Sequence, residues 1–114
     1  MVRVSGSELK ANGGPALKVE NCGHVTLTGN SLFHPLEGYD TPAVVLEGGN
    51  AVMTGNYLLS TDKGIAVRKG VQSCVITGNT LETGAQALIV DESVPKDSLV
   101  IDANLERKYL KNSE

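Results

Sequence analysis

The fold is decided by the stretch VTLTGN at 25–30, which returns as AVMTGN at 51–56 and as CVITGN at 74–79. The copies begin 26 and then 23 residues apart, and decayed copies at Ser5-Gly6-Ser7 and Asp102-Ala103-Asn104 continue the series on both sides. A period near 24 residues is typical of a solenoid, in which each repeat stacks on the one before it. The sequence therefore predicts a stack of about 4–5 coils.

Apolar and polar residues alternate before each triplet, which is the period of a strand with one buried face. A second alternating strand precedes each full copy, and leucines after the triplet indicate a short third strand. Two inward columns are expected in the triplet strand: Val2, Val25, Ala51, Cys74, Leu99 and Val4, Leu27, Met53, Ile76, Ile101. Two more are expected in the preceding strand: Leu17, Val44, Ile65, Leu88 and Val19, Leu46, Val67, Val90. The third strand adds the column Leu9, Leu32, Leu58, Leu81 and, one position early, Leu105.

A leucine-rich repeat is the alternative with a similar period, because the segment 25–32 fits its short core L-x-L-x-x-N-x-L. That repeat returns through a helix or an extended segment with widely spaced leucines. Here the return segment is a compact alternating strand bounded by Gly, Pro and Asn. The favoured fold is therefore all-β, a right-handed single-stranded parallel β-helix solenoid.

The Asn column is expected to be structural. Asn tolerates the left-handed backbone angles of a tight turn, and its amide can stack on the amide one coil away. The sequence therefore predicts an internal ladder without chemistry, formed by Asn30, Asn56, Asn79 and Asn104.

With this alternation and this Asn column, the chain resembles the pectate-lyase-like right-handed β-helix superfamily from Val2 to Leu105. The resemblance implies a fold and not an activity, because many functions use that fold. It also implies that a ligand lies along the outward side of the strand before the triplet strand. The Asn-Thr-Asp, Asp-Asp, Gly-His-Gly and Arg-Ile-Lys motifs of polygalacturonases do not occur in the chain. No cofactor is expected, and Ca²⁺ has no supporting motif.

The outward side of that strand carries the candidate site. One column holds Lys18, Val45, Ala66 and Ile89, and the next holds Glu20, Glu47, Arg68 and Asp91. Arg68 is expected to neutralise Glu47 and Asp91. The alternative is catalysis by Glu20 and Glu47, one coil and about 5 Å apart, as in retaining glycosidases, with Arg68 as a third weak candidate. Every column of a solenoid has that spacing, so the spacing alone is weak support.

The loop 34–42 brings more polar side chains, Glu37 among them, beside this face, either as a surface excursion or as ligand contacts. The candidate ligand-binding residues are Lys18, Glu20, Glu47, Arg68, Asp91, His34, Tyr39 and Asp40.

The composition argues against some classes of binding partner. The 114 residues carry a net charge of -3 and no basic run, which argues against nucleic acid and anionic membranes. No apolar stretch approaches the length of a membrane span, and the first residues lack the apolar region of a signal peptide. An extracellular or cell-surface place is expected if the chain is a fragment of a secreted protein. Cys22 and Cys74 lie in different columns, so no disulfide is expected.

The ends of the stack suggest further partners. Coils are expected over 1–105 and a cap or tail over 106–114, where the segment 104–111 is compatible with a short helical cap. The first coil would leave Val2, Val4 and Leu9 at an open sheet end, so a second copy or further coils of a parent protein are expected there. An outward stripe of Val52, Val75 and Val100 suggests a covered surface, either by the segment 109–110 or by a second subunit.

The sequence favours a noncatalytic module that binds or positions a polysaccharide on its outward strand face, within a larger carbohydrate-active or surface protein. The alternatives are a polysaccharide lyase or glycoside hydrolase acting on acidic glycans, and a structural oligomerisation rod like those of phage tails and adhesins. Whether the chain is an enzyme stays open, and the missing motifs lean against it.

Overall fold

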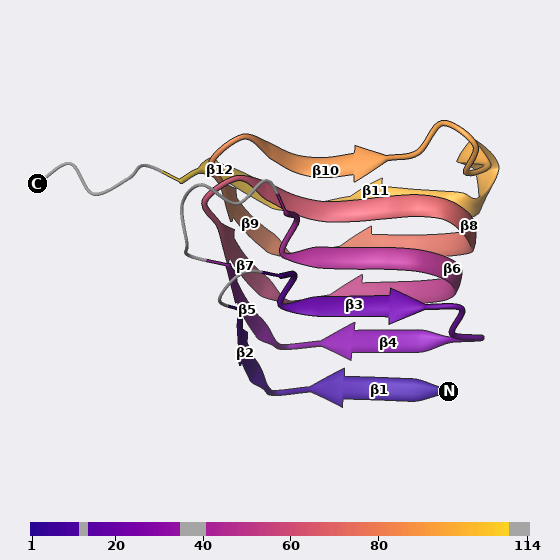
Figure 1. Cartoon of the computed structure of the whole chain (residues 1–114), viewed down its shortest axis with the longest axis horizontal. Coiled ribbons are helices and arrows are strands. Elements are labelled where there is room, and N and C mark those ends of the chain that lie inside the picture. Colours follow the sequence, from indigo (N-terminus) through magenta and orange to yellow (C-terminus); the bar gives the residue numbers. More distant parts are fainter. Residues whose placement is uncertain (12–13, 35–40, 110–114) are drawn as a thin grey trace, which may run out of the picture.

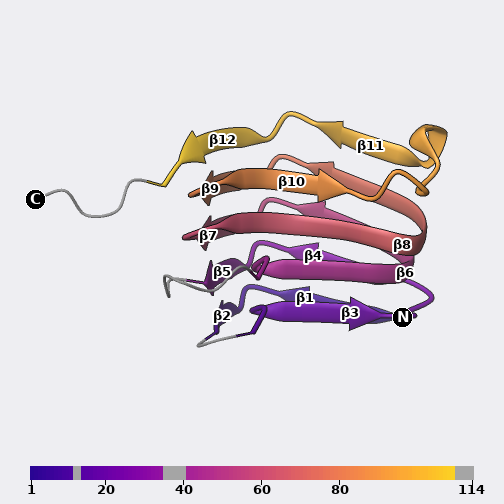
Figure 2. The ribbon, with the colours of Figure 1, turned by 45° about the horizontal axis from the view of Figure 1, so that its top comes forward.

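The chain folds into a parallel β-solenoid of about four turns (Figure 1). The computed structural model describes residues 1–11, 14–34 and 41–109. Each coil has three strands, which stack in register on the strands of the next coil and give the solenoid three faces. We call these faces A, B and C, in the order in which the chain passes through them from residue 17 on. Strands of faces A and B run in opposite directions, and face C lies at the side where the chain turns back (Figures 1 and 2). The all-β solenoid predicted from the repeats is thus confirmed.

The first two faces form one seven-stranded sheet, because β6 and β8 continue from one face into the other. Face A contains β3 (Leu17–Glu20), the first halves of β6 (Val44–Thr54) and β8 (Lys63–Thr77), and β10 (Gln86–Val90). Face B contains β1 (Val2–Ser5), β4 (Val25–Thr28), the second halves of β6 and β8, and β11 (Leu99–Asp102). Face C is a five-stranded sheet of β2 (Glu8–Lys10), β5 (Ser31–His34), β7 (Tyr57–Ser60), β9 (Thr80–Thr83) and β12 (Leu105–Lys108).

The core lies between the faces and follows the predicted columns in the middle coils. In the first column Val25 pairs with Ala51, which pairs with Cys74, and all three are buried. In the first and last coils, residues of the same columns are exposed to solvent: Val2 is 48% exposed and Ile101 is 37% exposed. The prediction that Leu105 points inward is wrong. Leu105 pairs with the outward Thr80 and is 56% exposed, because Glu106 takes the position opposite Leu81.

The Asn ladder is confirmed. The side-chain Nδ2 of Asn30 donates to Oδ1 of Asn56 at 3.0 Å, Asn56 donates to Asn79 at 2.9 Å, and Asn79 donates to Asn104 at 3.0 Å. Each receiving Oδ1 also accepts the backbone N–H of the preceding Asn, at 2.9–3.0 Å. The remaining amide hydrogen donates to a backbone carbonyl, as from Asn56 to Leu27 at 2.9 Å. Buried amides of this kind are stable only when their donors and acceptors have partners.

The left-handed residue of each triplet is not the Asn, as the sequence suggested, but the residue before it. Gly29 and Gly55 have φ of 66° and Gly78 has φ of 68°, and Ala103 takes the same position in the last coil with φ of 56°. Gly adopts these angles without steric cost. The residue before the Asn therefore makes the turn, and the Asn side chain forms the hydrogen bonds of the ladder.

The turn between faces A and B is close-packed. Gly48 and Gly49 both have left-handed φ, 81° and 75°, and a Cβ on Gly49 would overlap the carbonyl oxygen of Cys22 in the coil below. The side chain of Asn50 donates to the carbonyl of Gly23 at 2.8 Å. These contacts hold adjacent coils at the corner beside the candidate site.

The C-terminal coil corrects a further prediction. Instead of a helical cap, residues 105–108 form strand β12, so strand structure extends to Lys108 and past the expected boundary at 105. The backbone N–H of Leu105 donates to the carbonyl of Asn79, and that of Tyr109 donates to the carbonyl of Thr83. These bonds give backbone groups of the segment the partners that they need in a strand. The remainder, 110–114, lies outside the described residues.

The helical content of the described chain is the 3-10 turn η1 (Lys96–Ser98), which follows the core residue Val94 in the loop between β10 and β11. No helix in the described ranges is long and apolar enough to cross a membrane.

We predict that Asn56→Ala destabilises the protein strongly. The change removes the acceptor of two Asn30 donors and one donor to the carbonyl of Leu27. Because each buried unpaired group costs about 1–3 kcal/mol, the free energy of unfolding in urea should fall by at least about 3 kcal/mol. Asn104→Ala, in the half-buried last step of the ladder, is the control and should cost less; equal losses would contradict this account.

We also predict that two glycines with similar angles differ in tolerance. Gly29→Ala adds a Cβ with no atom within 4 Å, so it should cost only the left-handed penalty of about 1–2 kcal/mol. Gly49→Ala adds the same penalty and forces the coils apart at Cys22. Thermal unfolding should therefore rank Gly49→Ala well below Gly29→Ala, and the reverse order would show that the corner is not close-packed.

Candidate functional site

The two columns predicted on face A are in register, although Val45 and Ala66 of the first column are buried. Lys18 pairs with Val45, Val45 with Ala66, and Ala66 with Ile89. In the charged column Glu20 pairs with Glu47 and Glu47 pairs with Arg68. The strand register therefore places these side chains in successive coils along the solenoid axis.

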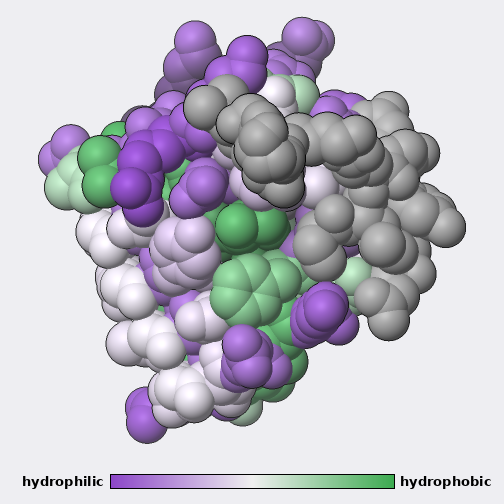
Figure 3. All heavy atoms as spheres, turned by 90° about the vertical axis from the view of Figure 1, so that its left-hand side faces the viewer, coloured by the Kyte–Doolittle hydropathy of each residue, from purple (hydrophilic) through white to green (hydrophobic). Residues whose placement is uncertain are grey.

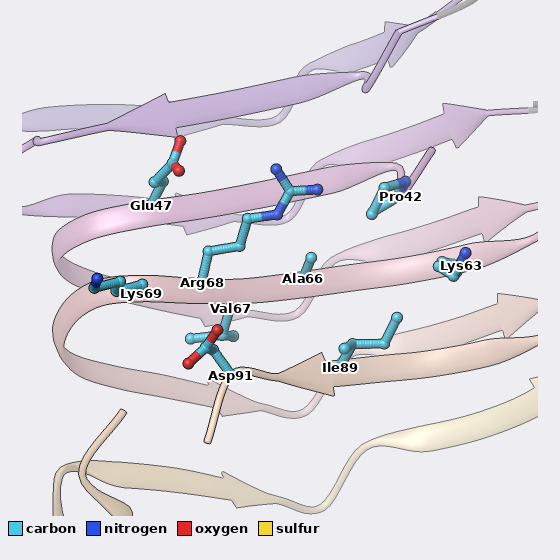
Figure 4. Close-up of a pocket in the computed structure, with 9 residues that line it drawn as sticks. All are labelled: Pro42, Glu47, Lys63, Ala66, Val67, Arg68, Lys69, Ile89 and Asp91. Carbon is cyan, nitrogen blue, oxygen red and sulfur yellow. The ribbon is translucent and has the colours of Figure 1, made fainter. Parts of the chain in front are cut away.

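A groove of about 390 Å³ crosses β6, β8 and β10 on face A (Figure 4). Its apolar lining is Pro42, Ala66, Val67 and Ile89, and its charged lining is Glu47, Lys63, Arg68, Lys69 and Asp91. The side chain of Arg68 extends from β8 toward β6, and Asp91 lies on the other side of β8 (Figure 4). Three of the predicted site residues, Glu47, Arg68 and Asp91, thus line one groove.

The charge pairing differs from the prediction. Lys18 Nζ lies 3.7 Å from Glu20 Oε2 and 3.8 Å from Glu47 Oε1, so it is Lys18 that bridges the two carboxylates. Arg68 makes no ion pair or hydrogen bond with any residue in the described part of the chain. Pairs this exposed contribute at most about 1 kcal/mol. Within residues 1–11, 14–34 and 41–109, the Arg68 guanidinium in the groove therefore has no acidic partner.

Asp91 is held by its own turn. The hydroxyl and the backbone N–H of Ser93 donate to Asp91 Oδ1, at 2.6 and 2.8 Å. These two hydrogen bonds, followed by the charge of Lys69, lower the pKa of Asp91. The backbone N–H of Val94 donates to the carbonyl of Asp91, and Val94 packs into the core. Asp91 therefore organises the turn that closes this end of the groove.

Glu20 and Glu47 do not form an acid and nucleophile pair of the usual kind. A carboxyl that acts as a general acid is normally held in an apolar pocket, whereas these side chains are 59% and 38% exposed and share Lys18. Among residues 1–11, 14–34 and 41–109, no group of three or more His, Cys, Asp or Glu side chains could hold a metal ion.

His34 is not a surface residue, which corrects its assignment to the ligand face. It is the last residue of β5, points into the interior beside Ser60 of the next coil, and is fully buried. Neither ring nitrogen has a hydrogen-bond partner among the residues that the structure describes. The other loop candidates, Glu37, Tyr39 and Asp40, lie outside the described residues.

Sequence reasoning missed the outer side of face C. Phe33 and Tyr57 lie there with ring centroids 6.1 Å apart and planes at 67°, and Tyr57 Oη donates to Glu82 Oε1 at 2.9 Å. Burial, followed by that hydrogen bond, raises the pKa of Tyr57. The alternation of β5 and β7 was the available signal, because both rings stand at outward positions.

The valine stripe is in register, Val52 with Val75 and Val75 with Val100, and Val100 is 52% exposed. That another segment or a second subunit covers this stripe stays a prediction.

Cys22 and Cys74 are both free, and burial raises the pKa of the Cys74 thiol to about 11. Cys74 is therefore a core residue and not a nucleophile.

No family model, no curated protein and no solved structure matches this chain.

We predict that His34→Leu does not weaken the fold. The change removes two unpaired buried nitrogens and keeps an apolar volume, so the free energy of unfolding should rise by about 1 kcal/mol. Ser60→Ala is the matched control, because Ser60 Oγ accepts the backbone N–H of Asp62 at 3.3 Å and its loss should destabilise. Destabilisation by His34→Leu in urea unfolding would show that the imidazole has a partner.

Proposed function

We propose that this chain is a noncatalytic β-solenoid module that binds an acidic polysaccharide along face A. The observation that carries the proposal is Arg68, whose guanidinium has no acidic partner among the described residues and lines a groove with an apolar floor.

The charges of the groove favour an anionic ligand. Its carboxylates are already engaged, Glu47 by Lys18 and Asp91 by Ser93. Arg68 and Lys69 remain with no ion pair to a described residue. A guanidinium pairs bidentately with a carboxylate, so a uronate sugar is the ligand that Arg68 fits best.

The shape of the groove favours a chain molecule. Its lining comes from three successive coils, β6, β8 and β10, which repeat at about 4.8 Å along the axis. Ile89, which is half-buried, offers apolar contact beside the charged positions. The resemblance to the pectate-lyase-like superfamily supports the same face, because ligands of such proteins lie along this strand. A lyase or hydrolase reaction is not part of the proposal, because Lys18 contacts both Glu20 and Glu47.

The test is isothermal titration of the chain with hexagalacturonate, a uronate oligomer. We expect binding that Arg68→Ala weakens at least tenfold and that Arg68→Lys restores only in part, because Lys lacks the bidentate fork. Lys96→Ala is the matched control: it removes an exposed cation from η1, which does not line the groove, and should leave the Kd unchanged.

Binding that is absent, or equal in Arg68→Ala, would overturn the proposal. New reducing ends in the incubated oligomer that disappear with Glu47→Gln would instead establish the enzyme alternative.

A further inference from the structure

The aromatic residues of this chain are few and gathered. The sequence holds one Phe and three Tyr, and the three that the structure describes are Phe33, Tyr57 and Tyr109. Phe33 and Tyr57 stand at outward positions of β5 and β7, and Tyr109 follows β12. All three are half-buried. A chain so poor in aromatics concentrates them on the outer side of face C.

The rings are held in place by contacts that cross four coils. The edge-to-face contact sets Phe33 against Tyr57, and the hydroxyl of Tyr57 is bound by Glu82. Arg107 Nη2 lies 3.9 Å from the same carboxylate oxygen. This series runs through β5, β7, β9 and β12, so the Phe33 ring packs against a tyrosine that is itself held by a hydrogen bond. Such preorganisation lowers the entropy cost of binding.

Beside the rings lies a hollow of about 420 Å³, lined by Glu8, Lys10, Phe33, Leu59 and Tyr109. Glu8 and Lys10 are exposed at its edge. Figure 3 shows apolar side chains in the middle of this side of the molecule, with side chains of near-neutral hydropathy along one edge and hydrophilic ones above and below. The hollow thus combines an aromatic surface with charged groups at the rim.

We propose that this hollow binds a neutral pyranose ring of a glycan chain, with Phe33 as the stacking surface. The C–H groups on the face of a pyranose carry partial positive charge and fit the negative face of an aromatic ring. The hydroxyls around the sugar can hydrogen-bond to the carboxylate of Glu8 and the ammonium of Lys10. An apolar peptide side chain would desolvate these charges without pairing them. The site does not use Arg68 and does not rest on the groove of face A.

The experiment measures binding of cellohexaose, xylohexaose and chitohexaose by isothermal titration. We expect at least one to bind, with a Kd that rises tenfold or more in Phe33→Leu. That variant keeps apolar volume but removes the aromatic face, and thermal unfolding should show that it folds like the native chain. Tyr57→Phe, which loses the hydrogen bond to Glu82, should weaken binding by a smaller factor.

Arg68→Ala is the control that separates the two sites, and it should leave binding of the neutral oligomers unchanged. Failure of all three oligomers to bind, or equal binding by Phe33→Leu, would overturn the proposal. A dimer in sedimentation that Phe33→Leu dissociates would also overturn it, because it would make a second copy the occupant of this face.

Discussion

The ladder of amides from Asn30 to Asn104 is the constraint on which the other contacts depend. Oδ1 of Asn56 accepts both the side-chain and the backbone N–H of Asn30, so the ladder aligns the main chain as well as the side chains. Buried donors tolerate little displacement from their acceptors. A buried donor without an acceptor has lost its hydrogen bonds to water and gained none in the protein, which raises the free energy of the folded state. With the triplets aligned, alternation sends Leu27 and Met53 into the core at the same level of each coil. The outer columns then repeat at the same spacing.

Most of the fold was predictable because two periods coincide, the period of two within strands and the period near 24 between coils. The position of His34 was predictable in principle, since it stands two residues after the buried Leu32 on the same strand. The partner of Glu47 was not predictable. The spacing of the columns brings several long cationic side chains within reach of the Glu47 carboxylate. Only the structure shows that Lys18 forms the ion pair with it.

The three faces carry different chemistry on one core. Face A presents charges over an aliphatic floor, face B presents Thr and Val in register, and face C presents aromatic rings. Outward side chains of a solenoid contribute little to the packed interior, so each face can change without disturbing the other two. If both proposed sites bind glycans, together they would hold one glycan chain more firmly than either site alone, provided that the chain can reach both.

The ladder joins residues that are 26, 23 and 25 positions apart in sequence, yet its side-chain hydrogen bonds all measure 2.9–3.0 Å. Differences in coil length are therefore absorbed away from the ladder, as at the corner between faces A and B, where the register of β6 against β8 shifts between Glu47 and Asn50. Such a molecule can be lengthened or shortened by copying or deleting a whole coil, because the new neighbours meet the same amide at the same place. Insertions in the connections would leave the rod intact and alter only what surrounds a face. In evolution and in engineering, the unit of inheritance for this architecture is thus the coil and not the domain.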